Sequence, residues 1–317
     1  MNRKSLIIML LSLIALSCFI YISFFGYRIR VLSQGTVKDT RQYKYHVLVG
    51  VTESNADYAK DFFEGTKYIC PIFDAVVELI EVGNISPDSF PDYCSDYAVY
   101  SNADGLILYS GNDTLSVKKL TGLSDKEIPV VIAGETGTGS QHVSHVTSSK
   151  FELGKLAASE IVRSGWKKPV AIVRKNYRSD ESYRIISTIE RNLKSGSKIK
   201  VHTLYSEEVI DDEVRSLMMN LYQNDSADVI ITFTAEETNL VSQTIIDQNL
   251  TDKLCVIGFY GDRKTSEYIK KGIVQANIYA DPWELGEASA EELLKWKSSG
   301  FSNNYRQIVP KIRRGAE

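Results

Sequence analysis

The sequence predicts an α/β protein built from two doubly wound parallel-sheet lobes. From about residue 44 to the C-terminus, short apolar stretches alternate with longer amphipathic ones, which is the order of strands and helices in such a fold. The apolar stretches are nearly continuous, as expected of parallel strands that are covered on both faces. Two similar sets of these units lie before and after about residue 135, and 317 residues suffice for two domains of ordinary size.

The first set follows a polar stalk at residues 31–43. Its strands, rich in Val, Ile and Leu, are expected at 45–51, 74–82, 104–110 and 128–134. Its helices are expected at 56–70, with Asn55 as N-cap, and at 91–101 and 113–122.

The second set repeats the alternation. Its strands are expected at 168–174, 198–206, 227–234, 253–259 and 273–280. Its helices are expected at 150–165, 179–196, 211–224, 237–249, 265–272 and 282–300. Pro282 is well placed in the first turn of the last helix, and residues 305–313 form a closing extended segment.

Between the two sets lies a glycine-rich loop, GETGTG, at Gly134–Gly139. Its spacing is close to that of a phosphate-binding P-loop, which makes a nucleotide-binding enzyme an alternative. A P-loop, however, needs a Lys after the last glycine and a helix after the loop. Here Ser140 stands at the Lys position, and the next residues are β-branched or small and polar, which favours a strand or extended loop.

The N-terminus predicts a membrane anchor within residues 1–30. The basic stretch Asn2–Lys4, with Arg3 and Lys4, precedes Ser5–Tyr27, a segment without charge whose helix is about 34 Å long and spans a bilayer. The favoured topology is single-pass, with the N-terminus in the cytoplasm and the rest outside the bacterial cell. Two alternatives remain open: a cleaved signal peptide, and lipid modification at Cys18.

Composition excludes several function classes. The net charge of -3, with basic residues scattered among acids, does not favour nucleic acid. The four cysteines and four histidines have no zinc-site spacing, so neither a metal nor a cofactor is expected. Cys70 and Cys94 are expected at opposite ends of a strand–helix unit and therefore unbonded. No nucleophile elbow or dinucleotide fingerprint is present, so the chain is expected not to be an enzyme.

Four segments, from about residue 44 onward, resemble a known family in its order and spacing. They are HVLVGVTESNADYAKDFFEGTKY, ADGLILYSGND, IPVVIAGETGTGSQHVSHVTSSKFELGKLAAS, and LCVIGFYGDRKTSEYIKKGIVQANIYADPWELGEASAEELL. They are similar to type I periplasmic solute-binding proteins of the ribose-binding group, which share their lobes with lactose-repressor-type regulators. An N-terminal membrane segment in place of a helix-turn-helix argues against the repressor branch.

This resemblance implies two lobes joined by a hinge of three strands that closes over a ligand. It places the crossings near 134–135, 280–281 and 305. Lobe 1 is then 44–134 plus 281–305, and lobe 2 is 135–280 plus 306–317. The glycine loop is interpreted as the first crossing.

The resemblance also implies a set of ligand-binding residues at strand ends facing the cleft. Tyr58 falls where the family carries a stacking aromatic, and the family's usual acidic and amide positions hold Gly134, Ala235, Tyr260 and Ala280. The pentose or hexose pattern therefore does not carry over, although the acids fit a cationic or polyhydroxyl ligand. The expected site residues are Asn55, Asp57, Tyr58, Asn112, Asp113, Glu135, Arg178, Glu181, Glu236, Tyr260 and Asp281.

Two roles follow from the family. The chain delivers a small polar solute, most simply a carbohydrate, to an ABC permease, or it presents that solute to a membrane histidine kinase or chemoreceptor. A spanning anchor favours the sensor role. A ligand-independent protein-interaction module is a further alternative.

Overall fold

The computed structural model describes residues 43–52, 56–80, 89–123, 125–136, 139–174, 179–193, 198–205 and 210–315. Residues 44–317 form one compact unit, separate from residues 1–43. The expected anchor lies outside the described residues, as do Asn55 and Arg178. Within the described part of the chain, no helix is both long enough and apolar enough to cross a membrane.

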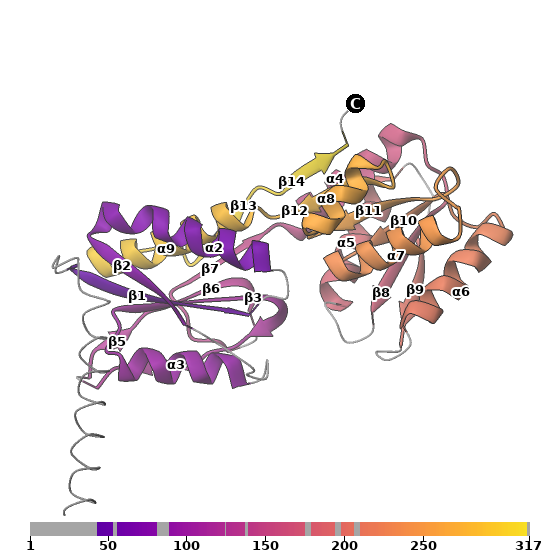
Figure 1. The fold of residues 1–317 in the computed structure, drawn as a ribbon. Helices are drawn as coiled ribbons and strands as arrows, with labels where there is room; N and C mark the ends of the chain where they lie inside the picture. Colours follow the sequence, from indigo (N-terminus) through magenta and orange to yellow (C-terminus); the bar gives the residue numbers. More distant parts are fainter. Residues whose placement is uncertain are drawn as a thin grey trace, which may run out of the picture. The chain divides into compact units, whose positions relative to one another are not determined.

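The first of two six-stranded sheets has the order β13-β7-β6-β3-β1-β2 and is parallel throughout (Figure 1). Its strands are β1 (Tyr45–Thr52), β2 (Ala75–Ile80), β3 (Gly105–Leu115), β6 (Val130–Thr136), β7 (Ser144–Ser148) and β13 (Tyr305–Ile308). Alternate residues face opposite helices: Val47 and Val49 of β1 join the core under α2 (Ala56–Ile69) and α9 (Pro282–Ser299), and Leu48 joins the core under α3 (Phe90–Tyr100).

The second sheet has the order β14-β12-β11-β10-β8-β9, and only β14 runs antiparallel to its neighbour. Its strands are β8 (Pro169–Arg174), β9 (Lys200–Leu204), β10 (Val229–Thr232), β11 (Cys255–Phe259), β12 (Val274–Tyr279) and β14 (Lys311–Arg314). One face packs on α4 (Lys150–Ser164) and α5 (Ser179–Asn192). The other packs on α6 (Ile210–Gln223), α7 (Ala235–Asp247) and α8 (Arg263–Lys270).

Short polar side chains begin the helices that start near the carboxyl ends of strands. The hydroxyls of Ser149 and Thr234 accept hydrogen bonds from the third residues of α4 and α7. Asp262 forms a reciprocal capping box with Thr265 at the start of α8. These caps fix where each helix begins relative to the strand before it.

The expected helix at 113–122 is wrong. Instead, β3 continues through a register shift between Ser110 and Thr114, so that Leu115 pairs with Thr136 of β6. A short hairpin of β4 (Leu120–Thr121) and β5 (Glu127–Ile128) follows. The segment has β-branched residues at Thr114, Val117 and Thr121, which suit a strand better than a helix.

Two of the expected crossings are also wrong. Strand β7 pairs with β6, so the chain leaves the first sheet after Ser148 and not at residues 134–135. Strand β13 pairs with β7, so the last crossing is at 309–310 and not at 305. The middle crossing is at 280–281, between β12 and α9.

Cys70 and Cys94 are free thiols on opposite faces of the first sheet. Cys70 belongs to the core on the α2 side, whereas Cys94 belongs to the core on the α3 side. The sheet itself therefore separates the two sulfur atoms.

Candidate functional site

The order of the strands points to one edge of each sheet. In doubly wound sheets, ligands bind beyond the carboxyl ends of the strands, at the point where the strand order reverses. In the first sheet that point lies between β1 and β3, and in the second it lies between β8 and β10. The side chains that follow these strands are therefore the candidates for contact with a ligand.

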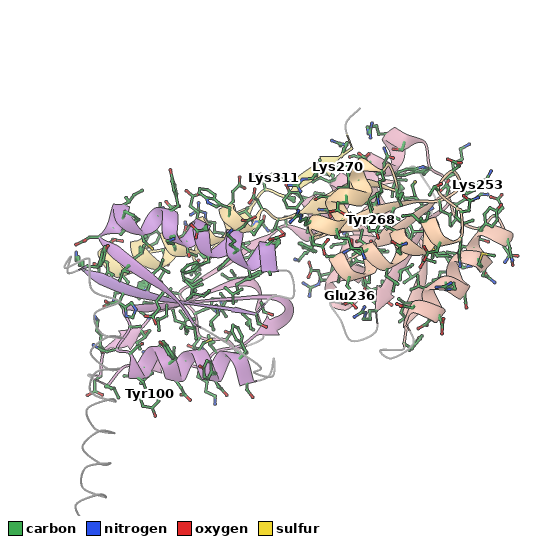
Figure 2. All side chains as sticks on the ribbon, viewed as in Figure 1. Tyr100, Glu236, Lys253, Tyr268, Lys270 and Lys311 are labelled. Carbon is green, nitrogen blue, oxygen red and sulfur yellow. The ribbon has the colours of Figure 1, made fainter. Side chains whose placement is uncertain are left out.

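At the reversal point of the second sheet, Arg174 forms a two-point ion pair with Glu236. Arg174 is the last residue of β8, and Glu236 lies in the first turn of α7, just after β10. The guanidinium Nη2 is 3.1 Å from Oε1 of Glu236, and Nη1 donates to Oε2 at 3.2 Å. The Arg174 side chain is 17% exposed, whereas that of Glu236, labelled in Figure 2, is 67% exposed.

The neighbouring Glu237 faces inward. Its side chain is 2% exposed and lies 4.0 Å from Nε of Arg174. The backbone N–H of Phe233 donates to its Oε2 at 3.0 Å. Burial raises the pKa of Glu237 to about 7, although the Phe233 hydrogen bond and the Arg174 charge act in the opposite direction.

A second polar cluster joins the end of β11 to two helices that cover the same sheet, α4 and α5. The hydroxyl of Tyr260, which directly follows β11, donates to Oε1 of Glu181 at 2.7 Å. Lys150, the first residue of α4, donates to the same oxygen at 2.6 Å. The structure thus brings together two expected residues, Glu181 and Tyr260, with a lysine that the sequence did not indicate.

Tyr58 has partners within the chain. Its ring stacks on Tyr109 of β3, with centroids 5.7 Å apart and planes 17° apart, and the residue is 8% exposed. Its hydroxyl donates to the carbonyl of Ala280 at 2.9 Å. Tyr58, the expected stacking aromatic, is therefore mostly buried where α2 meets the middle crossing.

Asp281 also has a structural role. Its Oδ1 accepts from the N–H of Trp283 at the start of α9, and its Oδ2 accepts from Lys311 of β14 at 2.6 Å. Lys311 is also 2.7 Å from Glu284. The Asp281 carboxylate thus joins the middle crossing to the strand that follows the last one.

The remaining expected residues are less informative. Asn112 and Asp113 lie within β3 and not after it, and Glu135 lies within β6; their side chains are outside the described part of the structure. Among the described residues, no group of three or more His, Cys, Asp or Glu is arranged to hold a metal ion.

A pocket of about 340 Å³ lies beside the middle crossing. Asp57 and Tyr58 of α2 contribute to it, together with residues of α8, α9 and two strands of the second sheet, β12 and β14. The lining residues are Asp57, Tyr58, Lys60, Asp61, Gly261, Asp262, Arg263, Ser266, Asn277, Tyr279, Pro282 and Arg313. Its walls carry both acids and cations, and Arg313 lies over the ring of Tyr279, 5.5 Å from its centroid.

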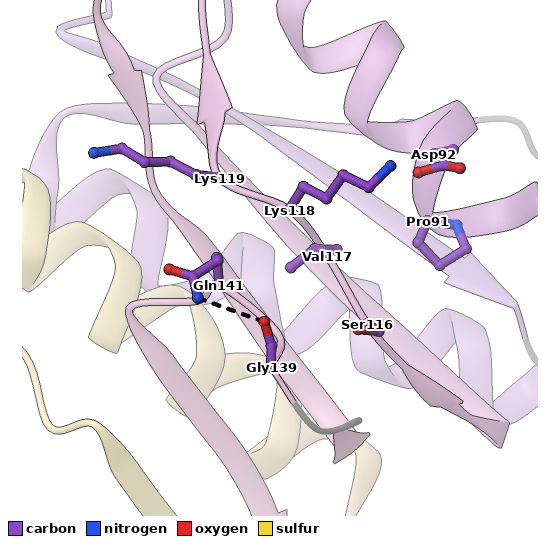
Figure 3. Close-up of a pocket in the computed structure, with 8 residues that line it drawn as sticks. All are labelled: Pro91, Asp92, Ser116, Val117, Lys118, Lys119, Gly139 and Gln141. Atoms are coloured by element: carbon purple, nitrogen blue, oxygen red, sulfur yellow. Dashed lines mark hydrogen bonds between the residues drawn. The ribbon is translucent and has the colours of Figure 1, made fainter.

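The glycine loop leads from β6 into β7 and not into a helix, which removes the architecture that a P-loop requires. Gly134 has a φ of 100°, which a residue with a side chain rarely adopts, and its carbonyl accepts from Nε2 of His145 at 2.6 Å. Beyond the loop, Gln141 donates to the carbonyls of Val117 and Gly139. Gly139 and Gln141 line a second pocket, of about 380 Å³, with Lys118 and Lys119 (Figure 3).

Sequence reasoning missed Arg174 and Lys150. Arg174 ends an expected strand, and a charged residue directly after an apolar run is the signal that marks a strand end at a sheet edge. Lys150 offered no comparable signal, because a basic residue at the start of a helix is ordinary.

A family model described as periplasmic binding protein domain matches residues 79–296. Solved structures share the fold. A glucose-galactose binding protein, GanP, from Geobacillus stearothermophilus is 17% identical, with a TM-score of 0.68 over 86% of this chain and 98% of that one. An arabinose binding protein, AraP, from the same species is 16% identical, with a TM-score of 0.69 over 85% and 96%.

A third similar structure is a complex between XylFII and LytSN. The matching chain is 21% identical, with a TM-score of 0.65 over 85% of this chain and 98% of that one. No curated protein matches the sequence.

Proposed function

We propose that this chain, which belongs to the family of periplasmic binding protein domains, is an extracytoplasmic solute-binding protein that holds a small polar ligand without catalysis. The observation that carries the proposal is the placement of Arg174 and Glu236 at the reversal point of the second sheet. A planar guanidinium and a carboxylate that stand side by side offer donors and acceptors in a fixed geometry.

A sugar is the ligand class that suits this edge best. Each sugar hydroxyl both donates and accepts, so it can be satisfied by the Arg174–Glu236 pair and by the Tyr260–Glu181 pair together. The fold neighbours named for glucose, galactose and arabinose support the same class. Glu181 and Glu236 already pair with Lys150 and Arg174. This disfavours the cationic ligand that the acids alone indicated.

Direct measurement of binding tests this proposal. The full chain, purified in mild detergent, is screened by thermal shift against pentoses, hexoses, polyols, nucleosides, amino acids and polyamines. A ligand at one hundred times its dissociation constant stabilises by about 2.7 kcal/mol, which raises the melting temperature clearly. A sugar that binds the wild type and binds Arg174→Gln at least about tenfold more weakly supports the proposal.

Lys253→Gln is the matched control. It removes an exposed positive charge just before β11, at the amino end of the second sheet, where no ligand contact is expected. Binding that is lost equally in both variants contradicts the assignment to the strand ends. Binding of no compound in the panel contradicts the solute-binding function itself.

The proposed delivery partner is an ABC permease or a membrane histidine kinase, with residues 1–30 as the tether. The fold neighbour solved as a complex of XylFII with LytSN supports a role that includes a protein partner. Chemical cross-linking in native membranes, with and without the ligand found above, tests the choice. Recovery of permease subunits supports uptake, and recovery of a kinase supports sensing.

A further inference from the structure

Tyr260 has an unusual backbone conformation. Its φ is 54°, in the left-handed region that bulky residues rarely adopt because it strains the backbone. Strand β12 holds this conformation in place: the N–H of Tyr260 donates to the carbonyl of Ile278 at 3.0 Å, and the next N–H, of Gly261, donates to Oδ1 of Asn277 at 2.9 Å. The strained turn therefore aims the Tyr260 side chain in one fixed direction.

That direction places the ring against two cores. Tyr260 packs against the core between the first sheet and helices α2 and α9, which contains Tyr109. It also packs against the core between the second sheet and helices α4 and α5, which contains Phe259. Its centroid is 6.4 Å from that of Phe259. Few side chains of the described residues have this double contact, because each core is otherwise covered by its own helices.

The hydroxyl end of the ring is also fixed. It donates to Glu181, which is 8% exposed and accepts from Lys150 as well. The ring therefore has an apolar surface packed on both cores and a polar tip bonded to a buried carboxylate. A bound sugar, with its apolar face and its hydroxyls, makes contacts of the same two kinds.

We propose that the Tyr260 side chain occupies part of the space in which the ligand binds. The wild-type protein therefore accepts only small ligands, and a variant without the ring accepts larger ones. The ring stands at the carboxyl end of β11, the sheet edge to which the proposed function assigns the ligand. The limit on ligand size rests on that proposed function. The claim that the ring of Tyr260 fills this space is tested independently of sugar binding.

The main variant is Tyr260→Gly, which removes the ring and at the same time suits the positive φ. The probe is 4-methylphenol, which has the shape of the missing side chain. In the full chain, 4-methylphenol is expected to raise the melting temperature of Tyr260→Gly in a saturable way and to leave that of the wild type unchanged. Adding Glu181→Gln to Tyr260→Gly is expected to weaken this effect, because the phenol hydroxyl loses its charged acceptor.

The second measurement compares mono- and disaccharides. Tyr260→Gly is expected to bind larger sugars at least about tenfold more tightly than the wild type does, whereas Tyr260→Phe, which keeps the ring, retains the wild-type preference. Tyr268→Ala is the matched control: Tyr268 is a buried tyrosine of α8 whose hydroxyl bonds to Gln243, and it packs in the core on the α6–α8 face of the second sheet. It should lose stability and keep the wild-type size preference.

The outcomes separate the two proposals. If sugars bind but Tyr260→Gly neither responds to 4-methylphenol nor changes its size preference, the assignment of Tyr260 is wrong and the proposed function stands. If 4-methylphenol stabilises Tyr260→Gly through Glu181 but no sugar binds any variant, the assignment stands and the proposed function is wrong. If Tyr260→Gly does not fold, Tyr260→Asn replaces it, since Asn also accepts a positive φ.

Discussion

Arg174 and Glu236 form their two-point contact across the reversal of strand order in the second sheet, and so join the end of β8 to the start of α7. The exposed carboxylate of Glu236 orients the guanidinium, and the buried carboxylate of Glu237 lies 4.0 Å behind it. Arg174 therefore lies within ion-pair distance of one exposed and one buried carboxylate. This arrangement makes the arginine and the two acids unequal in their expected effects on stability.

Arg174→Gln is expected to lower the free energy of unfolding at pH 8 by about 2 kcal/mol, because it leaves the ionised Glu237 buried without its nearest cation. Glu236→Gln removes only an exposed partner and should cost less than about 1 kcal/mol. Urea unfolding of the two variants and the wild type measures the difference. Equal losses would show that the exposed pair, and not Glu237, carries the effect.

The raised pKa of Glu237 predicts a pH dependence of stability. Its pKa is about 7 in the folded protein against an ordinary 4.5, so the folded state binds the proton more tightly than the unfolded state does. The free energy of unfolding should therefore fall as the pH rises from about 4.5 to 7, by about 3 kcal/mol from this group. Glu237→Gln, neutral at every pH, should flatten this decline and be more stable than the wild type at pH 8. Glu236→Gln, measured in parallel, should retain the decline.

Helices α2 and α9 approach so closely that Gly65 has no room for a side chain. A Cβ at this position would run into the backbone carbonyl of Trp283. Gly65→Ala is expected to destabilise the protein by about 1–3 kcal/mol, since the helices must separate. Gly122→Ala is the control, because its Cβ would meet nothing closer than 3.4 Å. A thermal melt of Gly65→Ala that matches the control would contradict this packing.

Arg306 of β13 is expected to matter for the first sheet. Its Nη1 lies 3.0 Å from Glu292, whose side chain is fully buried, and 2.6 Å from Glu291. Arg306→Gln should cost about 3 kcal/mol, because a buried carboxylate then keeps only Asn303 as donor among the described residues. Lys295→Gln, which breaks an i,i+4 pair between the exposed Lys295 and the same Glu291, should cost less than about 0.5 kcal/mol. Chemical denaturation at pH 7 compares the two.

The alternation of apolar strands and amphipathic helices predicted the fold well. The strand at 45–51 and the helix at 56–70 differ from β1 and α2 by one residue at one end each, because period and capping are local properties of the sequence. The prediction for segment 113–122 failed because the β-branched residues were not weighed, and because the pairing of Thr114 and Leu115 with β6 is not local in sequence. The positions of the crossings were also predicted wrongly, because they depend on strand pairing. Only the pairing of β7 with β6 and of β13 with β7 shows that β7 and β13 belong to the first sheet.

The candidate site was harder to predict than the fold. Residue type identified Glu181 and Tyr260, but not that they contact each other, since they are far apart in sequence. Asp57 lines a pocket, whereas Asp281 caps α9 and binds Lys311. A carboxylate in a loop has the same appearance in the sequence whether it binds a ligand, a helix end or a lysine.

Residues 305–314 supply an edge strand to each sheet, β13 to the first and β14 to the second. As the chain is synthesised, neither sheet is complete until this stretch has emerged from the ribosome. The same stretch also supplies Arg306 and Arg314, which form ion pairs with the buried carboxylates of Glu292 and Glu160. Both sheets therefore depend on one short stretch for a strand, and a truncation before residue 305 would leave both incomplete.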